Sequence, residues 1–377
     1  MTFLAGLLVV VFLVLTIAVI ARISKLAKRL DSDEESQAGG AVSLTSNKIN
    51  AVLMPIFFIV GIISAWWSYL DAKKYFLPEA ASEHGIKTDS MFAISMLLCL
   101  VAFFLTNAFL FYFAWKYQYK PGRKATFYPV NHRLEYIWTA APAVMMAIMV
   151  FFGWKLWTDI TKEAPENSYV VEIMGKQFGW QVRYPGIDDN KLGRYNYKLI
   201  DEYNEFGVDV ADENSFDDIT GTEMHVPKGK PVLLKIRARD VLHSVFIPHM
   251  RVKMDAVPGM PTKFWFIPTK TTEEMRYELG NPDFNYEIAC TEICGQGHFG
   301  MKMTLVVEES EAACKKWLAT QKPWFTNTIA SNPDYLKRVP ENLKAKAMKY
   351  VEGVAPTDST TAGVQPTGVV GGNAALR

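Results

Sequence analysis

Four long uncharged apolar runs, all before residue 155, constrain the fold of this chain more than any other feature. Each run approaches or exceeds the roughly 20 apolar residues that an α-helix needs to cross a bilayer. The runs cover residues 2–21, 49–70, 90–115 and 136–154. We therefore predict four membrane-spanning helices. Helices buried in a large soluble protein would carry polar residues at regular intervals, and these runs do not.

Basic residues beside these runs predict how the chain is oriented, because cytoplasmic loops retain lysine and arginine during insertion. The second loop has only Lys73, Lys74 and Lys87, whereas the first and third loops are richer in basic residues. Those of the first and third loops are Arg22, Lys25, Lys28, Arg29, Lys48, Lys116, Lys120, Arg123, Lys124 and Arg133. We expect both termini on the outer face of the membrane, with everything after Trp157 in an extracytoplasmic domain. In a bacterium with two membranes, that domain would lie in the periplasm on the outer face of the inner membrane.

The first run could instead be a cleaved secretory signal. Such a signal carries basic residues before its apolar run, whereas here the first basic residue, Arg22, follows the run. A retained helix is therefore predicted, and the cleaved signal is the alternative. The formal net charge of +1 gives no indication of a nucleic-acid partner.

After Trp157 the pattern changes to short alternating segments separated by turn residues, which is typical of a β-sandwich or barrel. In one of these segments, Lys235, Arg237 and Arg239 alternate with apolar residues, so they should form the wet face of a strand. The predicted strands are 169–174, 232–239, 263–267, 284–289 and 301–307. Short helices are expected at 311–321 and 341–351, and a disordered tail is expected beyond Gly353.

A polar stretch between Pro185 and Pro227 is rich in carboxylates. They are Asp201, Glu202, Glu205, Asp209, Asp212, Glu213, Asp217 and Asp218. An acidic surface of this kind could attract a basic protein partner over a long range. The alternative is a solvated loop whose charges only keep it soluble.

The strongest chemical signal is the string CTEICGQGHFGM, which runs from Cys290 to Met301 between two predicted strands. It contains two thiols, an imidazole and a thioether within twelve residues. This soft donor set suits copper better than magnesium, calcium or manganese. Three glycines in the string allow tight turns, so that Cys294, His298 and Met301 can converge.

A further ligand is expected from the upstream string DVLHSVFIPHMRVKMDAVPGM, which supplies His243. One early histidine with a late cysteine, histidine and methionine would make a mononuclear blue-copper site. The second thiol raises the number of copper ions that the site could hold from one to two, because Cys290 and Cys294 can bridge two ions. Each ion would then have one imidazole, from His243 or His298, with Met301 and a main-chain carbonyl as weak axial ligands.

Other sites could use the same cysteines. A disulfide between Cys290 and Cys294 suits an oxidising compartment, but it would leave the histidines and Met301 without a role. Zinc accepts two cysteines and two histidines, but closed zinc sites usually use short paired spacings and would not need the methionine. The remaining histidines and cysteines are interpreted as structural or surface residues: His84, His132, His225, His249, Cys99 and Cys314. Cys99 should be buried within its span.

Together the two strings resemble the dinuclear copper A domain of cytochrome c oxidase subunit II. The resemblance implies a membrane-anchored α plus all-β protein, in which N-terminal transmembrane helices precede a cupredoxin-like Greek-key β-sandwich or barrel. The implied copper ligands are His243, Cys290, Cys294, His298, Met301 and, through its carbonyl oxygen, Glu292. The Glu292 carboxylate is also implied to face a magnesium ion at the interface with subunit I.

The resemblance also implies a function and partners. The chain would accept electrons from cytochrome c or another c-type cytochrome and pass them to haem in subunit I. Oxygen would be reduced to water there, coupled to proton pumping, so no catalytic residue is expected in this chain. No CxxCH string occurs in the sequence, so no covalently attached haem is predicted.

Two further segments carry the resemblance, which extends from about Phe92 to Leu318. LEYIWTAAP is similar to the start of the family's second helix, where Glu135 corresponds to a glutamate near a proton path. A carboxylate favoured by the helix dipole would explain Glu135 equally well. GKQFGWQVRYPG is similar to the aromatic segment where electrons arrive from cytochrome c. The candidates there are Phe178, which replaces the family's first tryptophan, and Trp180.

The expected domain organisation combines these features. An extra transmembrane helix is expected at 1–22, a cytoplasmic loop at 23–48, a second extra helix at 49–70, the family's helix hairpin at 90–157, the copper domain at 158–321 and a C-terminal extension at 322–377.

Three other classes of protein fit the sequence less well. A quinol oxidase subunit II lacks copper, a copper assembly or storage protein would not cycle electrons, and nitrous oxide reductase is soluble with a large additional domain.

Overall fold

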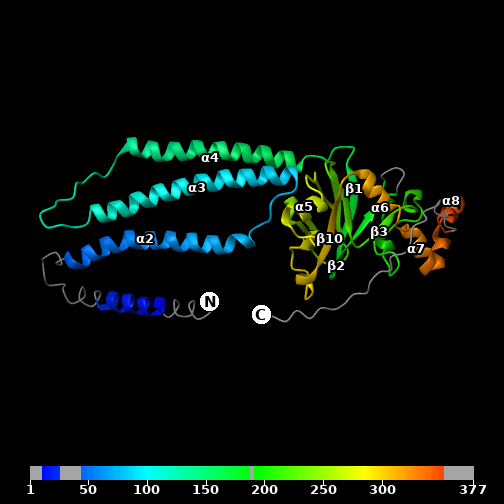
Figure 1. The fold of residues 1–377 in the computed structure, drawn as a ribbon, viewed down its shortest axis with the longest axis horizontal. Helices are drawn as coiled ribbons and strands as arrows, with labels where there is room; N and C mark the ends of the chain where they lie inside the picture. Colours follow the sequence, from blue (N-terminus) through cyan, green and yellow to red (C-terminus); the bar gives the residue numbers. More distant parts are fainter. Residues whose placement is uncertain (1–10, 26–43, 187–190, 352–377) are drawn as a thin grey trace. The chain divides into compact units, whose positions relative to one another are not determined.

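The computed structural model describes residues 11–25, 44–186 and 191–351 (Figure 1). Three helices are long and apolar enough to cross a membrane: α2 (Leu44–Ala72), α3 (Glu83–Lys116) and α4 (His132–Thr161). These helices contain the second, third and fourth predicted spans and fit membrane anchoring. Residues 11–25 are also helical. Residues 1–10 of the first predicted span, and 26–43 of the loop that follows it, lie outside the described residues.

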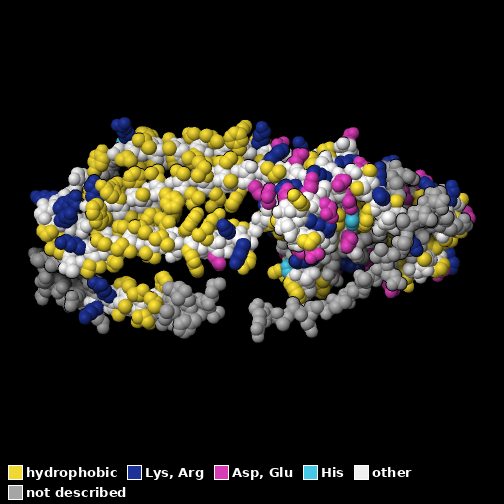
Figure 2. Space-filling model, viewed as in Figure 1, with side chains coloured by type: hydrophobic (Ala, Val, Ile, Leu, Met, Phe, Trp, Pro, Cys, Tyr) yellow, Lys and Arg dark blue, Asp and Glu magenta, His cyan; other side chains and the backbone are white. Residues whose placement is uncertain are grey.

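The apolar side chains of these helices are almost entirely exposed, as Figure 2 shows. An apolar surface of this size is unfavourable in water and favourable against lipid or neighbouring subunits. Cys99, which we expected to be buried, is exposed on α3, as are the apolar side chains around it on that helix. Helix α4 begins after Asn131, whose side chain accepts a hydrogen bond from the backbone N–H of Leu134.

The region after α4 is a sandwich of two five-stranded sheets, which confirms the predicted fold class. Sheet 1 has the order β3-β2-β1-β5-β8 and sheet 2 the order β4-β10-β9-β6-β7. Sheet 1 consists of β1 (Tyr169–Lys176), β2 (Gly179–Tyr184), β3 (Ile219–Gly221), β5 (Val232–Ala238) and β8 (Thr262–Phe266). Sheet 2 consists of β4 (Met224–Pro227), β6 (His243–Ile247), β7 (Val252–Ala256), β9 (Tyr286–Cys290) and β10 (Lys302–Glu308). Strands distant in sequence are neighbours, as in β1 with β5 and β10 with β4, and both of these pairs are parallel.

Alternation of side chains builds the core between the sheets. In β5, Leu234 and Ile236 are fully buried, while Lys235 between them is exposed. We expected Arg237 to lie on the solvent-exposed face of this strand. That prediction was wrong, because Arg237 is only 7% exposed. Other residues cover that part of sheet 1, so the outer face of β5 is not open to water throughout its length.

The segment between α2 and α3 is also part of the β-domain. Ala81 is fully buried in its core, and the backbone N–H of Ala81 donates to the carbonyl of His249 at 2.7 Å. The Ser82 hydroxyl donates to the carbonyl of Met250, also at 2.7 Å. Arg251 pairs with Asp89 at 2.8 Å. A fragment that begins after Trp157 would therefore lack contacts that the sandwich uses.

A second, smaller core covers one side of sheet 1. We call the segments that form it the lobe, residues 191–218 and 324–351. The lobe contains α7 (Trp324–Ser331), the 3₁₀ turn η6 (Pro333–Arg338) and α8 (Glu341–Val351), which confirms the helix predicted at 341–351. Phe206, Phe216 and Phe325 pack in this core together with Met174 of β1. The predicted tail beyond Gly353 lies outside the described residues.

Buried ions link the lobe to sheet 1. Arg183 of β2 pairs with Asp218 of the lobe at 2.6 Å, and Arg237 pairs with Glu172 of β1 at 2.6 Å. Arg183 also pairs with Glu172. The guanidinium of Arg237 lies 3.7 Å from the ring centre of Tyr195 in the lobe. We call Glu172, Arg183, Asp218 and Arg237 the ion cluster.

The carboxylates between Pro185 and Pro227 accordingly have a role that the sequence did not indicate. Asp218 is fully buried in the ion cluster. Glu205 pairs with Lys176 of β1 at 2.7 Å, and Asp201 accepts a hydrogen bond from the hydroxyl of Tyr335. Asp218 and Glu205 attach the lobe to sheet 1, and Asp201 joins the two segments of the lobe. These three side chains therefore belong neither to an open acidic surface nor to a merely solvated loop.

Candidate metal centre

His243 is the first residue of β6 and is fully buried. Its ring lies against β1 at Gly175, where a glycine is required. A side-chain carbon built at Gly175 would lie 2.9 Å from Cδ2 of His243, too close for real contacts. The absence of a side chain in β1 therefore leaves the space that the imidazole fills.

The remaining predicted ligands lie on the loop between β9 and β10, which we call the copper loop (residues 290–301). Cys290 ends β9, and its backbone N–H donates to the carbonyl of Met301 at 3.1 Å, which closes the base of the loop. Gly295 has φ of 136°, a conformation that L side chains rarely adopt. The predicted convergence of the loop thus depends on this glycine.

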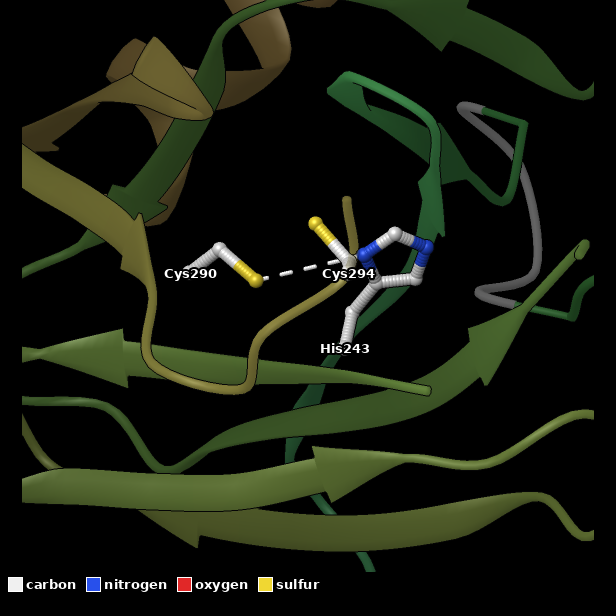
Figure 3. A group of neighbouring side chains, drawn as sticks. All are labelled: His243, Cys290 and Cys294. Atoms are coloured by element: carbon white, nitrogen blue, oxygen red, sulfur yellow. Dashed lines mark hydrogen bonds between the residues drawn. The ribbon is translucent and has the colours of Figure 1, made fainter. Parts of the chain in front are cut away.

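The sulfur and nitrogen donors of these residues face one another. One ligand atom from each of His243, Cys290 and Cys294 lies within 4.8 Å of the others, and Figure 3 shows the two thiols beside the imidazole. Nδ1 of His243 is 3.9 Å from Sγ of Cys290. Sγ of Cys294 is 3.6 Å from Nδ1 of His298 and 3.8 Å from Sδ of Met301.

Glu292 contributes its backbone to this cluster. Its carbonyl oxygen lies 3.3 Å from Sγ of Cys290, while the residue as a whole is exposed. All six predicted ligands therefore come together in the structure. A carbonyl beside the thiols supplies one hard donor to a site that is otherwise soft.

Asp240 orients His243. Oδ1 of Asp240 lies 2.9 Å from Nε2 of His243, so this nitrogen carries the proton and Nδ1 keeps its lone pair toward the sulfurs. Burial would raise the pKa of Asp240, but hydrogen bonds from Gln177, His243 and Val241 hold it below its usual value. Asp240 is thus ionised at neutral pH and fixes the tautomer that can bind a metal.

The thiols of Cys290 and Cys294 are free in the structure and available to bind a metal. All four cysteines lie in the described residues, and none forms a disulfide. Burial and the neighbouring Cys290 raise the pKa of Cys294 to about 11. A metal ion must therefore displace protons to bind here. Two thiols, two imidazoles, a thioether and a carbonyl exceed the four ligands of a closed zinc site and fit copper.

The two aromatic candidates differ in position. Trp180 of β2 is 4% exposed, and its ring centre lies 5.9 Å from that of His243. Phe178, in the turn between β1 and β2, is 44% exposed. It covers the copper loop, because a side-chain carbon built at Gly297 would lie 2.6 Å from Cγ of Phe178. Both rings thus border the metal centre, one inside the domain and one at its surface.

Glu135 is remote from this centre. It lies in the first turn of α4, where its carboxylate is 3.0 Å from Nδ1 of His132. The β-domain follows the other end of that helix, about 40 Å away at 1.5 Å per residue. The structure therefore separates Glu135 from the predicted metal ligands by most of the length of α4.

The other histidines and cysteines lie outside the cluster. His225 stacks on Trp317 at 3.7 Å, and His249 packs between the rings of Phe284 and Tyr286. Cys314 is a buried, unpaired thiol on α6 (Glu311–Leu318), as predicted. Sequence reasoning missed Asp240 and Gln177. The sequence offered one clue to each of them, which is closeness to a predicted site residue. Asp240 lies three residues before His243, and Gln177 lies immediately before Phe178.

Comparisons with known proteins agree with this geometry. The family described as cytochrome c oxidase subunit II, periplasmic domain, matches residues 169–310, and its transmembrane domain matches residues 64–156. The alternative cytochrome c oxidase subunit 2 of Bradyrhizobium diazoefficiens is 33% identical over 278 residues, which cover 73% of this chain and 88% of that protein. Cytochrome c oxidase subunit 2 of Cereibacter sphaeroides is 28% identical and covers 60% of this chain and 72% of its own length.

Among solved structures, the periplasmic domain of subunit II of the Bradyrhizobium japonicum cytochrome oxidase is similar to 42% of this chain. The similarity covers 97% of that structure, with 25% identity and a TM-score of 0.29. The two family matches cover the described helix α3, most of α4 and the whole sandwich. The chain belongs to the cytochrome c oxidase subunit II family and is a subunit of a haem–copper oxidase.

Proposed function

We propose that this chain is the electron-accepting subunit of its oxidase, with a dinuclear copper centre held by His243, Cys290, Cys294, His298, Met301 and the carbonyl of Glu292. Two copper ions held by these side chains would supply the uptake and release of one electron at a time. The electrons would come from cytochrome c or another c-type cytochrome and pass to haem in subunit I. Oxygen would be reduced there, coupled to proton pumping.

The observation that carries the proposal is the convergence of buried soft donors. Nδ1 of His243, the two thiols and Sδ of Met301 point toward one another. A buried polar group usually has a hydrogen-bond partner, because leaving it unpaired costs about 1–3 kcal/mol. Sulfur contacts of 3.6–3.9 Å are weak substitutes for such partners. A soft metal would satisfy all of these donors at once.

The residues around the ligands have separate roles in this proposal. Asp240 keeps Nδ1 of His243 deprotonated. Burial of Cys290 and Cys294 excludes water, and the glycine at 295 turns the loop back toward β6. The exposed Phe178 covers the loop at the surface and is our candidate for where the donor transfers its electron, with Trp180 as the second candidate. Neither ring is a metal ligand.

Two further roles follow from the position of carboxylates. The exposed side chain of Glu292 is proposed to face a magnesium ion at the interface with subunit I. Glu135, exposed at the start of α4, is proposed to aid proton uptake on the cytoplasmic side. Both proposals place the copper domain on the outer face of the bacterial inner membrane, consistent with the distribution of basic residues.

The test is a metal analysis and a paramagnetic-resonance spectrum of the full-length chain in detergent, after loading with copper. The full chain is needed because residues 77–89 contact the sandwich. We expect two copper ions per chain and a seven-line hyperfine pattern, which arises when one unpaired electron is shared by two equivalent copper nuclei. A four-line pattern would indicate a mononuclear site, and a chain that holds no copper would favour a quinol oxidase subunit.

A further inference from the structure

We propose that Gln177 is a positioning residue that couples the two sides of the copper centre. This inference rests on the function proposed above and adds a residue outside the ligand set. Gln177 lies in the turn between β1 and β2, on sheet 1, whereas the metal ligands belong to sheet 2 and its loop. It therefore connects the centre to the opposite sheet.

Two hydrogen bonds of Gln177 define the connection. Its side-chain Nε2 donates to the carbonyl oxygen of Cys294 at 2.6 Å. Its backbone N–H donates to Oδ2 of Asp240 at 2.8 Å. The other oxygen of Asp240 accepts a hydrogen bond from His243. A continuous path thus runs from the Cys294 peptide, through Gln177 and Asp240, to the imidazole.

Close packing makes this path stiff. Gly175, two residues before Gln177, lies against the ring of His243, and Phe178, the next residue, lies against Gly295 and Gly297. Tight packing of this kind transmits displacement because there is no free volume to absorb it. A shift of the turn would therefore move the imidazole, the copper loop or both.

The path matters because its two ends are brought together only by folding. His243 belongs to β6, whereas Cys294 belongs to a loop that approaches the imidazole from the other side. The described residues provide one side-chain hydrogen bond to the carbonyl of Cys294, the bond from Gln177. Losing it would allow Cys294 to move relative to His243, which changes how strongly and how equally the metal ions are held.

The experiment uses the copper-loaded full-length chain in detergent and the substitution Gln177→Leu. This change removes the side-chain donor and keeps the backbone N–H to Asp240. We expect two copper ions per chain still to bind. Removal of copper by a chelator should become about 2- to 10-fold faster, the equivalent of one hydrogen bond. The hyperfine splitting and the reduction potential should also change.

Three variants sharpen the result. Gln177→Glu has the same shape but, when ionised, no donor, so it should behave like Gln177→Leu and covers the case in which leucine prevents folding. Gln177→Lys restores a donor of similar reach and should restore slow copper removal. Gln296→Ala is the matched control. Gln296 is an exposed glutamine on the copper loop, for which the part of the chain that the structure describes provides no hydrogen-bond partner.

The outcomes distinguish this inference from the proposed function. If the unsubstituted chain fails to hold two copper ions, both are wrong. If it holds them, and Gln177→Leu and Gln177→Glu match it in copper removal, hyperfine splitting and potential, only the role of Gln177 is wrong. A change confined to the thermal unfolding temperature would also overturn it, because a purely structural residue would give that result.

Discussion

The β-domain buries polar side chains in two places, and the two differ in how those side chains are satisfied. In the ion cluster of sheet 1, two guanidinium groups face two carboxylates at 2.5–2.6 Å. In the copper centre of sheet 2, thiols, imidazoles and a thioether face one another at 3.6–3.9 Å with no opposite charge among them. The ion cluster is complete within the chain, and the copper centre requires something from outside it.

This difference separates a structural role from a functional one. Charges that neutralise one another fix the lobe on sheet 1 and offer nothing to a ligand. Donors that lack partners cost stability unless a metal binds, so their retention in the core indicates a metal site. Changes in the ion cluster should therefore affect folding and leave the copper spectrum intact, whereas changes in the copper centre should do the opposite.

The largest effect is expected from removing one of the two thiols that we propose as copper ligands. Cys290→Ser or Cys294→Ser should abolish the seven-line spectrum and lower the rate of cytochrome c oxidation by the assembled oxidase. We expect a loss greater than the roughly 10–100-fold that changes around a metal site typically cost. Cys314→Ser, a buried cysteine outside the cluster, is the control and should keep both properties. A Cys290→Ser chain that retains seven lines would contradict the assignment.

The next largest effect is expected from breaking the ion cluster. Asp218→Ala leaves Arg183 with one fewer carboxylate partner in a fully buried position. Loss of one member of a buried ion pair costs about 3–5 kcal/mol of unfolding free energy. Urea unfolding of the full-length chain, followed by tryptophan fluorescence, measures it. The copper spectrum of the folded variant should not change.

Glu213→Ala is the control for that experiment. Glu213 also belongs to the lobe, but its pair with Lys346 is about half exposed on both sides. Its loss should therefore cost less than about 1 kcal/mol. If Asp218→Ala and Glu213→Ala were equally stable, the ion cluster would not be what holds the lobe.

A smaller effect is expected from pH. Burial would raise the pKa of Glu172, but Arg183 and Arg237 lower it below its usual value of 4.5. The folded state therefore binds this proton more weakly than the unfolded state. The stabilisation is present above about pH 4.5 and is lost as the pH falls through the folded pKa. Between pH 7 and pH 3, the free energy of unfolding should decrease less steeply with falling pH for Glu172→Gln than for the unsubstituted chain.

The smallest effect is expected at the surface of sheet 2. Lys302 and Glu287 form a pair at 2.9 Å, with more than half of each side chain exposed. Exposed pairs of this kind contribute about 0.2–1 kcal/mol. Lys302→Ala should therefore change the unfolding midpoint only slightly and the copper spectrum not at all. A loss comparable to that of Asp218→Ala would mean that burial is not what distinguishes the two regions.

The proposed ligands could be selected from the sequence because most of them are close together in the chain. Five of the six lie within twelve residues, and their chemistry identifies the site before any fold is known. His243 was predicted as a ligand and His249 as a structural or surface residue; the structure places His243 beside the two thiols and His249 among aromatic rings. Asp240 and Gln177 were not selected, because a hydrogen bond across two sheets leaves no periodic or compositional trace.

The sequence predicted which side chains are buried less well than it predicted which side chains could bind a metal. Arg237 alternates with apolar residues in β5, a pattern that normally indicates a wet face. The lobe covers that face, and the lobe is built from two segments more than one hundred residues apart in sequence. The sequence of a single strand cannot reveal that another segment, here the one with Tyr195 and Phe206, will cover its outer face.

The sequence by itself determined the membrane helices, the β-domain and the soft donor set, because hydrophobic run length, side-chain alternation and ligand type are local properties. Only the tertiary structure decided that carboxylates of the acidic stretch hold the lobe, that residues 77–89 belong to the sandwich, and that Gln177 links Cys294 with Asp240. These are contacts between segments distant in sequence. Such contacts depend on how the sheets pack, and packing is a property of the whole domain.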